Sequence, residues 1–190
     1  MKICFASHNT NKVKEMNEIM PDGISIVGLD DLNITEDIAE TGSTLEENSE
    51  IKASYVYDRL GIPVFADDSG LLVKSLNGEP GVYSARYAGP ERDDNNNMNL
   101  LLENLKHHED RSAEFQTVIT YIDQNGSKKQ FKGIVEGQII KEKRGNNGFG
   151  YDPIFQPLNH EVTFAEMSHQ LKNQISHRAN AVQQLLDYLS

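Results

Sequence analysis

Two adjacent carboxylates stand near the middle of this chain, in the sequence Asp67-Asp68-Ser69-Gly70. Apolar segments flank the tetrad at 63–66 and 71–76, so we expect it to form a turn or bend between two strand-like runs. Paired carboxylates beside a glycine suit a hard cation such as Mg²⁺. A solvated turn capped by the Asp side chains is the alternative, and the tetrad alone does not decide between the two.

A second polar cluster, Ser7-His8-Asn9-Thr10-Asn11-Lys12, follows an apolar run at 2–6 and precedes apolar residues at helical spacing. This pattern predicts a strand, a turn and a helix. Backbone N–H groups at a helix start attract phosphate, and Lys12 adds a positive charge. The chain has no Gly-x-x-x-x-Gly-Lys-Ser/Thr loop, and a simple helix cap with an exposed lysine is the alternative interpretation.

Glycines alternate with aromatic residues in Gly148-Phe149-Gly150-Tyr151-Asp152-Pro153. Such a loop offers a close backbone approach and a ring for stacking on a nucleotide base, a contact worth about 1–3 kcal/mol. The alternative is a turn that carries two core aromatics.

Cations follow in a predicted last helix from about Ser168 to Leu189, where Lys172 precedes Ser176-His177-Arg178. Positions i, i+5 and i+6 are spread by roughly 140° and 240° around an α-helix. Either the helix begins late, or the cations reach different parts of a ligand.

The elements that position these residues alternate between strand and helix patterns. Thr44 with Glu47 has capping-box spacing at the start of a predicted helix that ends at Gly61. Another helix is expected at 93–107, and Asn125-Gly126 joins two alternating segments, 113–123 and 128–140, as a hairpin. The pattern favours an α/β domain with a mixed sheet, and no internal boundary divides residues 1–190.

Composition excludes several classes of function. The chain has 190 residues, 37% of them hydrophobic, and a formal net charge of −11, which disfavours nucleic-acid binding. The N-terminal apolar run turns polar too early for a secretory segment or a membrane span, so we expect an untargeted cytoplasmic protein without membrane association. The single cysteine, Cys4, is expected to be a buried small hydrophobe.

Taken in order, these segments resemble the inosine triphosphate pyrophosphatase family, also called the dITP/XTP pyrophosphatases. The resemblance covers essentially the whole chain and rests on seven ordered motifs: Ser7 to Lys12, Glu40-Thr41-Gly42, Glu47-Asn48 with Lys52, Ala66 to Leu71, Pro80 to Tyr87, Gly148 to Phe155, and Ser176-His177-Arg178.

The resemblance implies a two-lobed α/β domain around a long mixed β-sheet, with a nucleotide-binding cleft between the lobes and usually a homodimer. It implies hydrolysis of ITP, dITP and XTP to monophosphate and pyrophosphate with Mg²⁺, which cleanses the nucleotide pool. Asp68 would be the general base and a metal ligand together with Glu40. The residues implied to bind substrate are Ser7, His8, Asn9, Thr10, Asn11, Lys12, Lys52, Ser69, Phe149, Gly150, Tyr151, Asp152, Lys172, His177 and Arg178.

There are three alternative functions, and the presence of Asp68, Glu40 and Lys12 together argues against the second, a non-catalytic sensor. A related-fold pyrophosphatase for modified pyrimidine triphosphates would carry a Ser-x-Ser-Pro-Arg-Arg-like loop, which this N-terminus lacks. A nucleotide sensor would bind the same ligand without turnover. A general phosphatase would release orthophosphate first.

Overall fold

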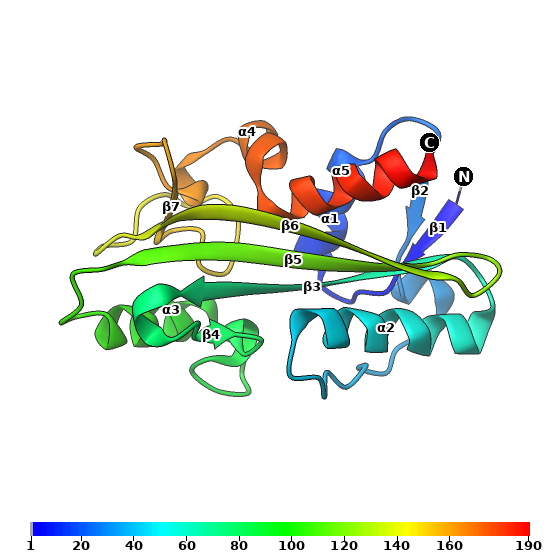
Figure 1. The fold of residues 1–190 in the computed structure, drawn as a ribbon, viewed down its shortest axis with the longest axis horizontal. Coiled ribbons are helices and arrows are strands. Elements are labelled where there is room, and N and C mark those ends of the chain that lie inside the picture. The colour runs from blue at the N-terminus through cyan, green and yellow to red at the C-terminus, as the bar shows by residue number, and fades with distance from the viewer. Residues whose placement is uncertain (1) are drawn as a thin grey trace. The chain divides into compact units, whose positions relative to one another are not determined.

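The computed structural model describes residues 2–190 as a mixed α/β fold (Figure 1). Its described strands are β1 (Lys2–Phe5), β2 (Ser25–Val27), β3 (Val64–Val73), β4 (Pro80–Gly81), β5 (Ser112–Ile122), β6 (Lys128–Ile139) and β7 (Phe155–Pro157). The α-helices are α1 (Thr10–Ile19), α2 (Leu45–Leu60), α3 (Asp94–Asn104), α4 (His169–Ile175) and α5 (His177–Leu189). No helix within 2–190 is long and apolar enough to cross a membrane.

The seven strands form one mixed sheet in the order β2-β1-β3-β5-β6-β7, and β4 pairs with β3. Strand β1 runs parallel to β2 and β3, whereas β4 and β7 are antiparallel to their neighbours β3 and β6. The predicted mixed sheet is therefore confirmed.

The chain divides into two compact units. Unit 1 comprises residues 1–68, 117–133 and 179–190, and unit 2 comprises 69–116 and 134–178. The division falls within three strands and one helix, after Asp68 in β3, Gln116 in β5, Gly133 in β6 and Arg178 in α5.

Unit 1 is built on the alternation of side chains along β1 and β3. Ile3, Phe5 and Phe65 contribute to one apolar cluster, while their strand neighbours Cys4 and Ala66 contribute to another. Because successive strand residues point to opposite faces, the two clusters lie on opposite faces of the sheet. Helices α1 and α5 cover the first face and α2 covers the second (Figure 1).

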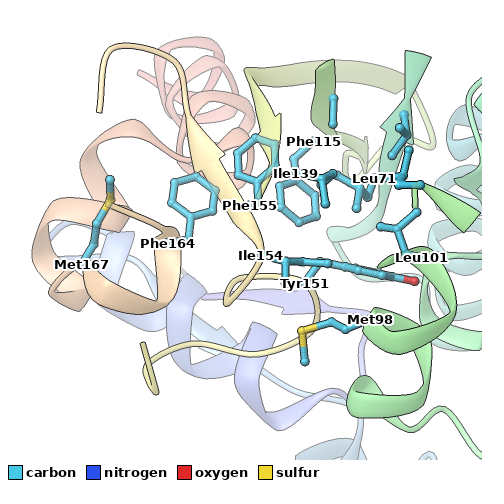
Figure 2. Packing of buried hydrophobic residues seen from close by; sticks show 13 residues of the cluster. Leu71, Met98, Leu101, Phe115, Ile139, Tyr151, Ile154, Phe155, Phe164 and Met167 are labelled. Carbon is cyan, nitrogen blue, oxygen red and sulfur yellow. The ribbon is translucent and has the colours of Figure 1, made fainter. Parts of the chain in front are cut away.

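Unit 2 has one apolar cluster, in which the aromatic rings are close neighbours (Figure 2). The ring centroids of Phe115 and Phe155 are 4.6 Å apart, and those of Phe155 and Phe164 are 5.2 Å apart. Tyr151 lies in the same cluster, and its hydroxyl donates a 2.7 Å hydrogen bond to the backbone oxygen of Ser84. The loop that carries Tyr151 is thus fixed to the core of this unit.

The local signals for α2 and for the hairpin are confirmed. Thr44 caps α2 by accepting from the Glu47 N–H at 3.1 Å, and Gly61 ends the helix in the left-handed conformation with φ 60°. The Glu47 carboxylate reaches one residue further back than a capping box requires and accepts from the Ser43 N–H. Strands β5 and β6 flank the predicted turn at Asn125-Gly126.

The prediction of a bend at Asp67-Asp68-Ser69-Gly70 is wrong. Strand β3 continues through the tetrad from Val64 to Val73, and the Asp67 and Asp68 residues are buried, with 1% and 7% of their surfaces exposed. Buried carboxylates persist only where they are paired, and lysines from two helices pair with these two. Those distant partners allow a polar sequence to form a central strand.

The prediction of one continuous last helix is also wrong. Helix α4 closes at Ser176, whose N–H donates to the Lys172 carbonyl at 2.9 Å. Ser176 then adopts an extended conformation, with φ −68° and ψ 156°, before α5 begins at His177. The break keeps Lys172, His177 and Arg178 all buried, which three positions spread around one helix would not easily allow.

Candidate functional site

The polar turn between β1 and α1 is organised by Asn9. Its Oδ1 accepts from the N–H groups of Asn11 at 3.0 Å and Lys12 at 3.1 Å, while its own N–H donates to Ser7 Oγ at 3.1 Å. The cap therefore satisfies two of the N–H groups that the sequence offered to a phosphate. Phosphate binding here would depend on the exposed Thr10 and Asn11 side chains and on the Lys12 ammonium more than on the helix start.

His8 anchors the same turn. Its Nδ1 lies 3.0 Å from Asp30 Oδ1, and its Nε2 lies 3.2 Å from the carbonyl oxygen of Glu36. Because both ring nitrogens are engaged by the segment 30–36, the imidazole holds the turn against that segment.

Two lysines reach the carboxylates of β3 from opposite faces of the sheet. Lys12 on α1 donates to Asp67 Oδ1 at 3.0 Å, and Lys52 on α2 donates to Asp68 Oδ1 at 3.5 Å. The alternation of strand side chains explains this division, because Asp67 points toward the α1 face and Asp68 toward the α2 face. Lys52 Nζ also donates to Glu40 Oε1 at 2.5 Å, so one ammonium joins two carboxylates.

Burial and charge act together on this cluster. Burial raises the pKa of the Asp68 carboxyl, Lys52 and Lys12 oppose the rise, and the charges of Glu40 and Asp67 add to it. Burial alone would lower the pKa of Lys52, but Asp68, Glu40 and Asp67 outweigh that effect and the pKa is raised. The result is a charged lysine beside a carboxylate that binds a proton more readily than an exposed Asp does.

The carboxylates of Glu40 and Asp68 are a donor set that fits Mg²⁺. Both carboxylates accept from the Lys52 ammonium. Within 2–190, no group of three or more His, Cys, Asp or Glu side chains could hold a metal ion by itself. Protein-bound Mg²⁺ commonly uses only one or two carboxylates, with substrate phosphates and water completing its shell. Two carboxylates are thus a sufficient protein contribution to a Mg²⁺ site that phosphate and water ligands complete.

In unit 2, the Asp152 carboxylate shapes the Gly-rich loop. Its Oδ2 accepts from the Phe149 N–H at 2.9 Å and from Lys172 Nζ at 2.7 Å. Gly148 lies against this oxygen with φ +72°, and a Cβ added there would stand 1.9 Å from it. The loop therefore requires a glycine at 148 on grounds of both conformation and space.

The Phe149 ring lies beneath two cations. Lys172 Nζ is 4.9 Å from the ring centroid and Arg178 Cζ is 5.7 Å from it, while Arg178 NH2 donates to Ser69 Oγ at 3.4 Å. Helical spacing alone would spread Lys172 and Arg178 around one helix. The break at Ser176 separates α4 from α5, and both cations approach the same ring. Cations over a ring face bind it electrostatically and fix its orientation.

His177 lies deeper than the sequence suggested. The residue is 4% exposed. Its ring stacks on that of Phe115, with centroids 4.6 Å apart and planes inclined by 10°. The imidazole is therefore part of the aromatic core of unit 2, and a contact with substrate through this residue stays a prediction.

Two residues of these networks were missing from the predicted site. Asp67 belonged to the conspicuous tetrad, and strand alternation would have assigned it a partner of its own once β3 was known to be continuous. Asp94, the first residue of α3, accepts from the Gly150 N–H through Oδ2 at 2.8 Å. Nothing in its sequence context distinguishes this role from that of an acidic residue in a first helical turn.

A model of the Ham1 family matches residues 3–188 of this chain. The chain belongs to the Ham1 family. Among curated relatives, the dITP/XTP pyrophosphatase of Flavobacterium johnsoniae is 51% identical over 190 residues, which cover all of this chain and 98% of the relative. That of Christiangramia forsetii is 52% identical over the full length of both chains.

Solved structures of other Ham1 proteins have the same fold. The Ham1 protein of Staphylococcus aureus superposes with a TM-score of 0.90 at 44% identity, and that of Coxiella burnetii with 0.91 at 43% identity. Each comparison covers 100% of this chain and 98% of the other. The mixed α/β fold is thus shared over the whole length of these Ham1 chains.

Proposed function

We propose that this chain is a nucleoside triphosphate pyrophosphatase that hydrolyses ITP, dITP and XTP to the monophosphate and pyrophosphate. The observation that carries the proposal is the Asp68–Lys52–Glu40 cluster, found in a chain about half identical over its full length to proteins named dITP/XTP pyrophosphatase. We treat residues 1–190 as one catalytic domain, since a single family model spans nearly all of it.

Lys12 and Lys52 are proposed to bind the triphosphate. A triphosphate carries about four negative charges near neutral pH, and its leaving pyrophosphate gains charge as the bond breaks. Both ammonium groups are only 11–15% exposed as side chains, so their attraction for phosphate is weakly screened by water. Ser7 to Asn11 would contribute hydrogen bonds from the turn that Asn9 and His8 hold in shape.

Asp68 is proposed as the general base that orients and deprotonates the attacking water. Its raised pKa supports this role, because a carboxylate with higher proton affinity is a stronger base at neutral pH. Lys52, at 3.5 Å, keeps the carboxylate charged and oriented between turnovers. Proton transfer would run from water to Asp68 as the oxygen attacks the α-phosphorus.

Glu40 and Asp68 are proposed to hold Mg²⁺. When bound, the ion would neutralise phosphate charge and polarise the phosphoryl group. The protein's own contribution is to keep both carboxylates next to one lysine, which prevents two like charges from separating in the absence of the ion.

The loop at Phe149 is proposed to bind the purine base. The ring would offer a stacking face of fixed orientation, while Arg178 donates to the 6-oxo group of inosine or xanthosine. Adenosine presents an amino donor at that position and would leave two donors opposed, whereas GTP would be rejected at its 2-amino group. Gly150, Tyr151, Asp152, Lys172 and His177 would complete the surroundings of base and sugar, with Ser69 toward the phosphates.

Two further proposals follow the family resemblance. The chain would act in the cytoplasm as a homodimer, and it would remove deaminated purine triphosphates before polymerases use them. Light scattering at several protein concentrations tests the dimer. The placement of the nucleotide relative to the two units stays a prediction.

Turnover of ITP, XTP, dITP, GTP and ATP with Mg²⁺ tests the proposed function when monophosphate, pyrophosphate and orthophosphate are assayed separately. We expect pyrophosphate from ITP, dITP and XTP, and turnover of ATP and GTP slower by about two orders of magnitude. Binding without turnover would show a sensor, and orthophosphate as first product would show a general phosphatase.

A further inference from the structure

Asn48 lies on α2 one helical turn before Lys52, and its side chain is completely buried. Its Oδ1 accepts a 2.8 Å hydrogen bond from the N–H of Gly42, the residue two positions after Glu40. Residues four apart share one face of a helix, so Asn48 and Lys52 lie on the face of α2 that meets the Glu40 segment. Asn48 binds the backbone N–H of Gly42, and Lys52 binds the carboxylate of Glu40.

The Glu40 segment, residues 40–43, packs closely against α2. A Cβ added at Gly42 would stand 2.6 Å from Glu47 Cβ and 2.7 Å from Asn48 Oδ1. The next residue, Ser43, is held as well, because its N–H and its hydroxyl both donate to Glu47 Oε2, at 2.6 and 2.9 Å. The glycine thus permits a close approach that these hydrogen bonds then fix.

The amide of Asn48 has a second feature that folding does not require. Its Nδ2 is buried and makes no hydrogen bond to any residue within 2–190. Turning the amide over would place NH₂ against the Gly42 N–H, so the observed orientation is the one that the contacts demand. A buried donor without a partner costs about 1–3 kcal/mol, so the Gly42 hydrogen bond is the contact of this amide that offsets the burial of Asn48.

We propose that Asn48 is a positioning residue for the reaction, which acts by holding Gly42 so that the Glu40 carboxylate stays on Lys52 and beside Asp68. The proposal rests on the proposed function for its activity readout. Without this hydrogen bond, the backbone two residues after Glu40 would be held less firmly, and the Glu40 carboxylate, whose side chain is 22% exposed, would sample other positions in water.

A double-mutant cycle tests whether Asn48 acts through Glu40. We expect Asn48→Ala to lower kcat/KM for ITP about 10–30-fold and Glu40→Gln to lower it more. In the Glu40→Gln background, Asn48→Ala should lower it less than about threefold further, because coupled residues are not additive. Effects that multiply across the two sites would overturn the proposal.

Hydrogen exchange of the Gly42 amide, followed by NMR, reads the same contact without substrate or metal. Asn48→Ala should speed this exchange at least about tenfold relative to the wild type. Unchanged protection of Gly42 would overturn the proposal even if activity fell. This readout also remains informative should the wild-type chain show no pyrophosphatase activity, an outcome that would defeat the proposed function instead.

Ser49→Ala is the matched control. Ser49 is the next residue on α2 and equally buried, and its hydroxyl bonds to Thr120 Oγ1 at 2.7 Å and to the Glu46 carbonyl at 3.0 Å. Ser49→Ala should lower the free energy of unfolding about as much as Asn48→Ala does. The exchange rate of the Gly42 amide and kcat/KM should both stay within about twofold of wild type. Equal losses of activity in both variants would mean that Asn48 is merely structural.

Discussion

The two units of this molecule use buried lysines in different surroundings. In unit 1, Lys52 joins the carboxylates of Glu40 and Asp68, and Lys12 reaches Asp67 from the opposite face of β3. In unit 2, Lys172 donates to the Asp152 carboxylate and lies over the rings of Phe149 and Phe164. The same residue type is therefore placed among charges in one unit and among aromatic faces in the other.

This difference indicates different roles for the two units in the proposed function. A cluster of carboxylates and lysines is suited to a divalent cation, to the phosphates that the cation and the lysines attract, and to proton transfer. A cation held over rings beside a loop of alternating glycines is suited to a flat, neutral base. We expect changes in unit 1 to affect all substrates alike, and changes in unit 2 to affect the choice among them or the fold of that unit.

The largest effect is expected from Asp68→Asn. Removal of the base should lower kcat by about 10³-fold for ITP and XTP alike, because proton transfer of this kind contributes roughly 10²–10⁴-fold. The isosteric amide should leave the melting temperature nearly unchanged, because burial already disfavours the charged form of Asp68 and Lys52 keeps its ion pair with Glu40. Steady-state kinetics and a thermal melt check both parts, and an active Asp68→Asn enzyme would remove Asp68 from the mechanism.

Lys172→Met should chiefly destabilise the protein. Both partners of the Lys172–Asp152 pair are 4% exposed as side chains, so loss of the lysine leaves an uncompensated buried carboxylate, at a cost of about 3–5 kcal/mol. Urea unfolding measures the loss. The double variant Lys172→Met with Asp152→Asn should recover part of it, and a double variant less stable than the single one would contradict this explanation.

Arg178→Ala should reduce selectivity. If Arg178 donates to the 6-oxo group, the preference for ITP over ATP in kcat/KM should fall about 10–100-fold. The ratio of two substrates is insensitive to the fraction of folded enzyme, so it separates recognition from any loss of stability. Full retention of the preference would assign recognition of the 6-oxo group elsewhere.

Gly148→Ala and Gly150→Ala form a matched pair within the same loop. Both glycines have positive φ, +72° and +61°, but only a Cβ at 148 would meet the Asp152 carboxylate, whereas position 150 has open space. We expect Gly148→Ala to raise KM for ITP at least about tenfold and Gly150→Ala to cost only its backbone strain of about 1 kcal/mol. Equal effects would show that backbone conformation alone matters.

The smallest effect is expected at Cys4, which lies in unit 1. Burial raises the pKa of its thiol to about 12, so at pH 8 the reactive thiolate is on the order of 10⁻⁴ of the folded population. Labelling with a thiol reagent should therefore follow unfolding of unit 1. Because the folded thiol keeps its proton longer than the unfolded one, stability should fall as pH rises above about 8.5, and less so in Cys4→Ala. Rapid labelling of native protein would contradict the buried position.

The predictions that depended on neighbours in sequence were correct. Thr44 and Gly61 bound α2 because a cap and a left-handed stop involve residues within one turn, and Asn125-Gly126 likewise joins two adjacent strands. Two predictions failed: the last helix is interrupted by the extended Ser176, and the predicted bend at Asp67 is a strand that depends on a distant partner. Asp67 can remain inside β3 because Lys12 pairs with it. The two residues are 55 positions apart, and sequence spacing over that separation does not predict a contact.

The candidate site divides in the same way. Its residue types were visible in the sequence, whereas their partners were not. The two acceptors around His8 are tertiary contacts, with residues 22 and 28 positions away, which the spacing of the motif does not indicate. The cap by Asn9 is local and is the helix cap that the sequence offered as an alternative to phosphate binding. The roles of these residues in binding and catalysis stay predictions.

Hydrolysis of ITP in ¹⁸O-labelled water, followed by ³¹P NMR and mass spectrometry of the products, tests the central claim most directly. If Asp68 activates a water that attacks the α-phosphorus, pyrophosphate should be released unlabelled and the ¹⁸O should appear in the monophosphate. Label in pyrophosphate would place the attack on the β-phosphorus, and labelled orthophosphate would place it on the γ-phosphorus. Either result would contradict the proposed reaction.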